Sequence, residues 1–292
     1  VHHNAAAPGT VDGPVSGRRI IVTSAAPPNG DGYGAALAFD LDGRPLGVVR
    51  DDPRIADPRG LRVDATGELL YLNSADRVLA LDADGGVVHD SGPIPGLNPG
   101  GANFGPDGRL YVGLRTARTI TAFSATLAAP PEPALPEDIV PFPRGFDFAS
   151  DGRLYLASGI GPTGQGARTI AAFSPNRTLV TPHLVHDPDL SPLDLLIAPN
   201  GDIIVASEHP FGTPDAVTTV RQYDAATGRL VRIFRPDEDV PFRQPRGLRI
   251  GPDGNLFCVA QDDVVAFDFT TGACLGTVVR YPNLNGQALE FF

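Results

Sequence analysis

Short apolar runs separated by polar turns follow one another along most of the chain, and one phrase of this kind recurs five times. The phrase is a proline, usually a glycine two residues later, an alternating apolar stretch, a polar turn ending in glycine, and a second apolar run. It begins at Pro58, Pro99, Pro143, Pro192 and Pro245, and it reads PRGLRVDATGELLYLNS at the first and PRGLRIGPDGNLFCVAQ at the last. The spacings of 41, 44, 49 and 53 residues between successive prolines are typical of β-propeller blades.

Each repeat resolves into four strands. In the repeat that begins at Pro58 we expect strands over residues 60–64, 69–74, 77–82 and 87–91, with ATG and ADG turns between them. The third strand is equally regular in other repeats, as TITAFS, TIAAFS and VVAFD. No segment keeps the i, i+3, i+4, i+7 spacing of an amphipathic helix beyond a turn or two. The pattern therefore predicts an all-β fold.

The two ends of the chain carry incomplete repeats that complement each other. RRIIVTS, GAALAFD and PLGVV near the N-terminus read as second, third and fourth strands, and LNGQALEFF at the C-terminus reads as a first strand. Joined in one sheet, they make a sixth blade and remove the exposed sheet edges. We therefore predict a six-bladed β-propeller over residues 17–292, preceded by a flexible tail over residues 1–16. An open sandwich with as many strands is the alternative, and it leaves the complementary ends unexplained.

Composition and charge narrow the partners. The chain has a net charge of −11 and no run of basic residues interleaved with aromatics, so we expect no nucleic-acid partner. No apolar run approaches the roughly 18 residues that a membrane-spanning helix needs, so we expect no membrane partner. The chain begins at Val1 and contains no Met, so the sequence is compatible with a cytoplasmic protein or with a secreted one that has lost a signal peptide. The content of Ala, Arg, Asp, Gly and Pro suggests a bacterial source.

The repeated phrase P-x-G-apolar-x-apolar, with its later G-x-L turn and R-apolar-x-x-apolar-D strand, resembles the NHL-repeat propellers and the broader gluconolactonase, SMP-30 and strictosidine-synthase-like group. The resemblance spans residues 17–292 and implies a hydrolase or lyase, although the group also includes pure interaction modules. Lactonase-like members hold a catalytic divalent ion near the axis, so the resemblance implies an axial ion such as calcium and no organic cofactor. The corresponding positions before the repeat glycine are here Arg59, Gly100, Arg144, Leu193, Arg246 and Asn285. Only Asn285 offers an oxygen there, with Asp194 one position away, so this sequence departs from the metal-binding pattern.

Arginines at these positions predict an anion site. Arg59, Arg144 and Arg246 fall at the bases of inner strands, and Arg115 lies at the end of a second strand. Guanidinium groups that converge on an axis repel one another unless an anion or carboxylates neutralise them. We therefore predict that these four arginines, with Asn285 and Asp194, bind a small carboxylate-bearing ligand. The alternative is internal pairing of the arginines with Asp147, Asp194 and Glu290.

Long loops on the same rim supply candidate catalytic groups. The loops are Ser24–Gly34, Ser158–Arg168 and Ser207–Ala216, and such loops on a rigid scaffold form pocket walls. They carry His209 beside Glu208, which together suit general acid or base catalysis, and Tyr33 as a further proton donor. Simple drift in loop length is the alternative reading.

These observations predict a hydrolase or lyase acting on a small polar, carboxylate-bearing molecule in the axial pocket. The alternative is a non-catalytic propeller that binds a protein or metabolite on the same face. The sequence leaves the substrate and the oligomeric state open.

Overall fold

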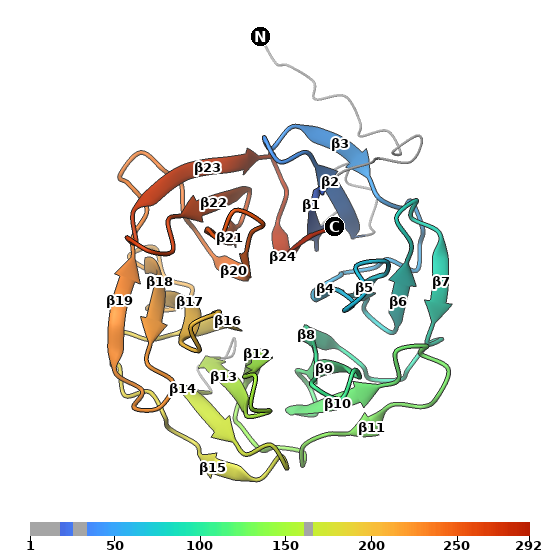
Figure 1. The fold of residues 1–292 in the computed structure, drawn as a ribbon, viewed down its shortest axis with the longest axis horizontal. Helices are drawn as coiled ribbons and strands as arrows, with labels where there is room; N and C mark the ends of the chain where they lie inside the picture. Colours follow the sequence, from blue (N-terminus) through green and yellow to red (C-terminus); the bar gives the residue numbers. More distant parts are fainter. Residues whose placement is uncertain (1–17, 26–33, 161–165) are drawn as a thin grey trace.

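Six four-stranded antiparallel sheets are arranged around a central axis in the computed structural model, which describes residues 18–25, 34–160 and 166–292 (Figure 1). The blade shared by the two chain ends contains β24 (Gly286–Phe291), β1 (Ile20–Ser24), β2 (Ala35–Phe39) and β3 (Pro45–Val48), in that order from the axis outward. The predicted six-bladed propeller is confirmed.

The other blades follow in chain order, each from its inner to its outer strand. They are β4 (Leu61–Val63), β5 (Leu70–Asn73), β6 (Val78–Leu81) and β7 (Val87–Asp90); β8 (Pro99–Phe104), β9 (Leu110–Leu114), β10 (Thr119–Phe123) and β11 (Glu132–Pro133); β12 (Pro143–Phe148), β13 (Leu154–Ile160), β14 (Gly166–Phe173) and β15 (Leu179–Thr181); β16 (Pro192–Ile197), β17 (Ile203–His209), β18 (Val217–Tyr223) and β19 (Leu230–Phe234); and β20 (Pro245–Ile250), β21 (Leu256–Ala260), β22 (Asp263–Phe267) and β23 (Cys274–Arg280).

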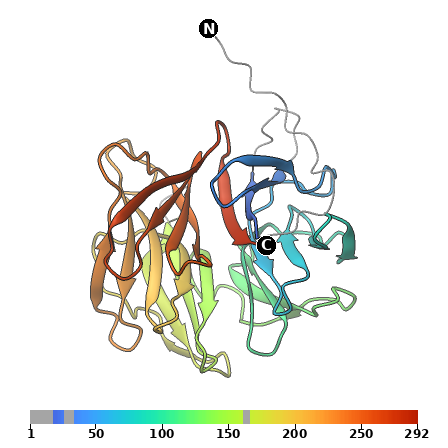
Figure 2. The same cartoon turned by 45° about the horizontal axis from the view of Figure 1, so that its top comes forward.

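The chain ends close the ring by strand pairing. β24 pairs antiparallel with β1, with Val22 opposite Leu289, and the two strands lie side by side in Figure 2. Both of these side chains are completely buried, in a core cluster that also contains residues of β21 and β22 from the preceding blade. The terminal segments therefore act as one sheet, as their complementary patterns predicted.

The hydrophobic core lies between the sheets, because successive side chains of a strand point to opposite faces of its sheet and so pack against the blades on either side. The second and third strands are buried almost throughout, as in β5 and β6, whereas the outermost strands expose residues such as Val180 and Val231. Edge-on aromatic pairs such as Tyr71 with Phe104 fill the same layer. Among the described residues, no helical segment has the length and hydropathy that crossing a bilayer requires.

Candidate functional site

Most inner strands carry an irregularity in their pairing near the start, which turns a side chain toward the axis. In β12 and β20 the residue pair Arg-Gly opposes a single residue of the neighbouring strand, so that each strand bulges at Arg144 and Arg246. A bulge of this kind re-aims a side chain out of the sheet. The glycine of the pair permits close packing of the blades, because a Cβ at Gly247 would lie 2.6 Å from the Cα of Ala288 in the next inner strand.

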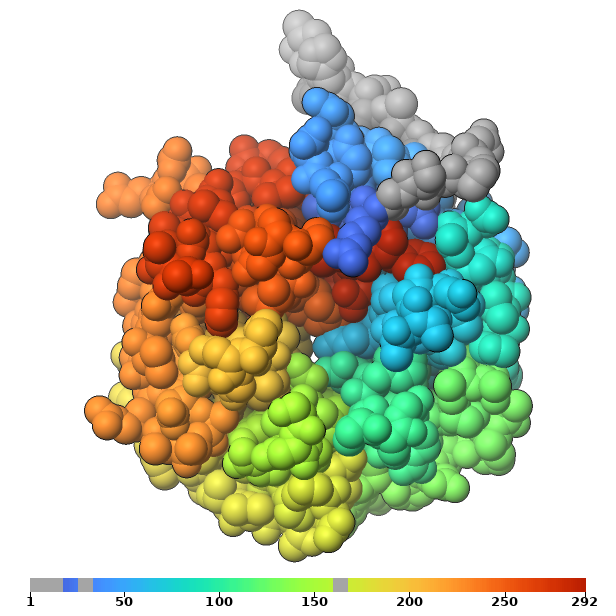
Figure 3. Space-filling model, in the orientation of Figure 1, coloured from blue at the N-terminus to red at the C-terminus, as the bar shows by residue number. Residues whose placement is uncertain are grey.

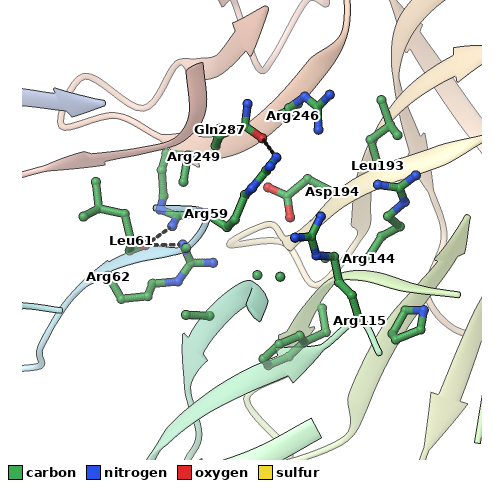
Figure 4. A pocket seen from close by; sticks show the side chains of 18 residues that line it. Arg59, Leu61, Arg62, Arg115, Arg144, Leu193, Asp194, Arg246, Arg249 and Gln287 are labelled. Atoms are coloured by element: carbon green, nitrogen blue, oxygen red, sulfur yellow. Dashed lines mark hydrogen bonds between the residues drawn. The ribbon is translucent and has the colours of Figure 1, made fainter. Parts of the chain in front are cut away.

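A cavity of about 70 Å³ lies on the axis at this level, and a space-filling view shows a narrow opening at the centre of the ring (Figure 3). Arginines dominate its wall, and the described lining residues include a single carboxylate, Asp194 (Figure 4). The six arginines are Arg59, Arg62, Arg115, Arg144, Arg246 and Arg249. The structure thus brings together five of the predicted site residues, Arg59, Arg115, Arg144, Arg246 and Asp194.

We call Arg59, Arg115, Arg144 and Arg246 the rim arginines. Arg59 donates to Oε1 of Gln287 over 2.6 Å and lies 2.8 Å from Oδ1 of Asp57. Its Nε is buried without an acceptor among the described residues, and the same holds for the Nε of Arg115. Buried donors without an acceptor are costly, which favours a ligand that supplies one.

Arg144 lies between two phenylalanine rings. Its guanidinium carbon is 4.5 Å from the ring centre of Phe142 and 5.2 Å from that of Phe211, which belongs to the loop after β17. Burial lowers the pKa of Arg144 to about 10, and repulsion by Arg246 and by the other rim arginines adds to this effect. Burial likewise lowers the pKa of Arg246 and of Arg115. Burial and mutual repulsion therefore disfavour the charged forms of these arginines when no ligand is bound.

The two neighbouring residues Glu208 and His209 point in different directions. Glu208 is 6 % exposed and accepts a hydrogen bond from the backbone N–H of Gly212, while its Oε2 has no partner among the described residues. Its negative charge opposes the lowering of the pKa values of Arg144 and Arg246, so it lies close enough to act on the rim arginines electrostatically. His209 instead places Nδ1 3.2 Å from Oγ of Ser191 and does not line the cavity.

Of the other predicted residues, Asn285 does not contribute to the described cavity wall. Asn285 lies next to it and accepts a 3.3 Å hydrogen bond from Nε2 of Gln287 through its side-chain oxygen. Gln287, which the sequence analysis missed, takes the place at the axis, because β24 bulges at this residue rather than at the position before the repeat glycine. Tyr33 lies outside the described residues. The catalytic roles suggested for His209, Glu208 and Tyr33 stay predictions.

A second tier of charges forms the floor of the cavity. Nε of Arg249 donates to Glu290 over 2.9 Å, and Nε of Arg62 donates to Asn103 over 2.8 Å. Asn103 in turn donates to Asp147. Pairing with an internal carboxylate, the alternative considered for the rim arginines, is thus the arrangement of Arg249, whereas Arg62 donates to Asn103 and to the backbone oxygen of Leu61.

Asp194 connects the two tiers. Its Oδ2 accepts the backbone N–H of Leu248 in the next blade over 2.9 Å, and Asp147 accepts the N–H of Ile197 over 2.8 Å in the same way. Burial raises the pKa of Asp194 to about 6, against the opposing effect of Arg62. Asp194 is therefore a carboxylate in the cavity wall that changes protonation close to neutral pH.

The described residues of the axis do not fit a divalent cation. Calcium binds six to eight oxygen ligands, several of them carboxylates. The cavity wall instead carries six guanidinium groups and one carboxylate, and the described chain contains no cluster of three or more His, Cys, Asp or Glu side chains arranged for a metal. The chemistry of this donor set suits an anion.

Comparisons with known proteins support the fold. No protein-family model and no curated protein matches the chain. Among solved structures, a gluconolactonase from Xanthomonas campestris is 17 % identical with a TM-score of 0.60, covering 90 % of this chain and 86 % of its own. A streptogramin B lyase is 15 % identical with a TM-score of 0.56, covering 79 % and 72 %. A chain of a nidogen–laminin complex is 13 % identical with a TM-score of 0.70, covering 94 % and 98 %. The chain therefore has a six-bladed propeller fold similar to that of gluconolactonases and a streptogramin lyase, as its repeat predicted.

Proposed function

We propose that the protein is a hydrolase or lyase that acts on a small, carboxylate-bearing molecule held in the axial pocket. The observation that carries this proposal is the convergence of four rim arginines on one cavity from four parts of the ring. Arginine presents parallel N–H donors that match a carboxylate, and its bonds to an anion are roughly twice as strong as neutral hydrogen bonds. In the absence of ligand, these charges are buried and repel one another.

Two carboxylates are placed to move a proton next to a bound anion. Asp194 lines the cavity, and Glu208 faces Arg144 and Arg246 with one oxygen atom unpartnered among the described residues. A carboxylate with a pKa of about 6, as in Asp194, serves either as a general acid or as a general base near neutral pH. Lactone hydrolysis and elimination both need such a group, and similar folds carry a gluconolactonase and a streptogramin lyase.

A binding function without turnover is the second candidate. It is favoured by the hydrogen bonds of the axial carboxylates, because Asp147 and Asp194 each accept a backbone N–H from the next blade. A carboxylate used in this way stabilises the ring and needs no catalytic role. This candidate predicts stoichiometric binding and no product.

The test is turnover of a panel of small lactones, esters and hydroxy acids that carry a carboxylate. For a substrate found in this panel, we expect Arg144→Ala to lower kcat/KM by about tenfold to a hundredfold, as the loss of one to two charge-assisted hydrogen bonds predicts. Arg153→Ala is the matched control, because Arg153 is exposed and pairs only locally with Asp151. Full activity of Arg144→Ala would contradict the proposal, and binding without product would favour the second candidate.

His209→Ala is a further arm of the same experiment. Because His209 does not line the cavity, retained activity in this variant together with a loss in Glu208→Gln assigns proton transfer to the carboxylate. The opposite result assigns it to the imidazole.

A further inference from the structure

We propose that the axial pocket takes up a dianionic head group together with one proton, and that this proton goes onto Asp194. The inference rests on the proposed anion binding and deepens it, because it names the ligand class: a dicarboxylate or a phosphate monoester. It follows from the charges around the cavity, from the position of Asp194, and from the size of the space.

The rim has a surplus of positive charge. Among the described residues, Asp57 pairs with Arg59 at 2.8 Å and Glu208 attracts Arg144 and Arg246, so that two described carboxylates act on the four rim arginines. Two positive charges are therefore left over at the level where a ligand enters. A dianion neutralises this surplus, whereas a monocarboxylate neutralises half of it.

The floor has the opposite imbalance. Its two arginines, Arg62 and Arg249, face the three carboxylates Asp147, Asp194 and Glu290. Over both tiers, six arginines face five carboxylates among the described residues, which leaves at least one positive charge, and protonation of Asp194 adds one more. In the unliganded pocket Asp194 thus supplies part of the negative charge that the rim needs, and a bound dianion takes over this role.

The position of Asp194 lets a bound anion replace its negative charge next to the rim arginines. Its side chain is directed toward the space between the rim arginines, and it lines the same cavity (Figure 4). A ligand anion in that cavity lies close to the carboxylate, and two negative charges at short range in a poorly solvated site do not both stay ionised. Burial has already raised the pKa of Asp194 to about 6, so a bound anion has to raise it further, to well above 7, for Asp194 to be protonated at neutral pH.

The charged and titratable groups near Asp194 come from several blades. Asp147 is the other fully buried acid nearby; burial raises its pKa, while Arg62 and the hydrogen bonds from Asn103, Phe148 and Ile197 oppose this shift. Because Asp147 is absent from the described cavity wall and Asp194 lines it, we assign the proton to Asp194. The charged and titratable groups around it are Arg144 and Asp147 of β12, Arg246 and Arg249 of β20, Arg59 and Arg62 at β4, Arg115 after β9, Cys258 of β21 and Glu290 of β24.

The size of the cavity agrees with a small head group. A space of about 70 Å³ holds roughly five water-sized spheres, since each needs about 10–15 Å³. A phosphate group or a short dicarboxylate is of this size. Larger parts of a ligand have to extend through the opening on the axis.

Calorimetric titration of the full chain at neutral pH tests the proposal with three probes: succinate, methyl phosphate and butyrate. Butyrate has the same four-carbon chain as succinate and one carboxylate fewer. Bis-Tris and Tris are suitable buffers because they are cationic and differ in ionisation enthalpy. We expect succinate or methyl phosphate to bind at least about tenfold more tightly than butyrate, and to take up close to one proton per site after correction for the ionisation of the probe. The arm that binds more tightly identifies the dianion as a dicarboxylate or a phosphate.

Asp194→Asn removes the titrating group and leaves a side-chain oxygen to accept the backbone N–H of Leu248. In this variant we expect tight binding without proton uptake, whereas Asp151→Asn, an exposed control, should behave like the wild type. Equal affinity for succinate and butyrate, or dianion binding without proton uptake by the wild type, would overturn the inference while anion binding stands. Failure of all three probes to bind would instead refute the proposed function. The comparison of buffers uses the wild-type protein alone, so it decides the question even if the variant does not fold.

Discussion

Arg115 illustrates how a single side chain of the pocket relates stability to binding. Its Nη2 donates a hydrogen bond to Oδ1 of Asn98 over 2.6 Å, and its Nε has no acceptor among the described residues. Burial lowers its pKa, and the charge of Arg59 lowers it further. Such a side chain costs free energy in the unliganded protein, and under the proposed function it stabilises a bound anion.

We therefore predict that Arg115→Gln weakens binding of the anion by about tenfold and leaves the free energy of unfolding unchanged or higher by up to about 1 kcal/mol. Denaturant unfolding without ligand and calorimetric titration with succinate measure the two effects. Arg153→Gln, at the exposed pair with Asp151, should change neither quantity by more than about 0.5 kcal/mol. A variant at Arg115 that loses stability and keeps its affinity would show that this side chain serves the fold.

The sequence predicted that three arginines lie together at the axis, but it did not predict the hydrogen bonds that hold them. Arg59, Arg144 and Arg246 share one position in the repeat, so their convergence follows from the register of the strands. Gln287 was missed because the bulge in β24 lies one residue beyond the repeat glycine, and only the pairing with β1 reveals it. The orientation of Glu208 was equally hidden, since either of two neighbouring residues at a strand end can face the axis.

Strand β24 closes the ring, because it pairs with β1 and so joins the end of the chain to its beginning. Leu289 of this strand is completely buried between the shared blade and the preceding blade, and Ala288 lies opposite Thr23 of β1. The terminal patterns alone predicted this pairing. The length of the outermost strand in each blade was not predictable, since β11 has two residues and β23 has seven on weakly patterned sequence.

Leu289→Ala should lower the free energy of unfolding by about 2–5 kcal/mol, through lost burial and the cavity that remains. Leu275→Ala is the control, because Leu275 lies on the outer strand β23 with 53 % of its surface exposed and should change stability by less than about 0.5 kcal/mol. Equal midpoints of the two variants in urea would contradict the view that the terminal strand closes a tightly packed ring.

For the whole molecule, the contrast in charge is the feature that matters most for function. The chain carries a net charge of −11, while its axial cavity is lined by six arginines and one carboxylate. The negative net charge of the protein therefore repels anions at long range, whereas the arginines of the cavity attract anions at short range. The net charge does not indicate this local cluster of arginines, which was predicted from their position in the repeat.

The most direct test of anion binding at the axis is anomalous scattering from crystals soaked in selenate, a small dianion that is located by its selenium atom. We expect a strong peak on the axis within hydrogen-bonding distance of at least two of the rim arginines. We also expect this peak to be lost in a double variant that carries Arg115→Gln and Arg246→Gln. Selenate peaks confined to the outer surface, with none at the axis, would contradict anion binding there.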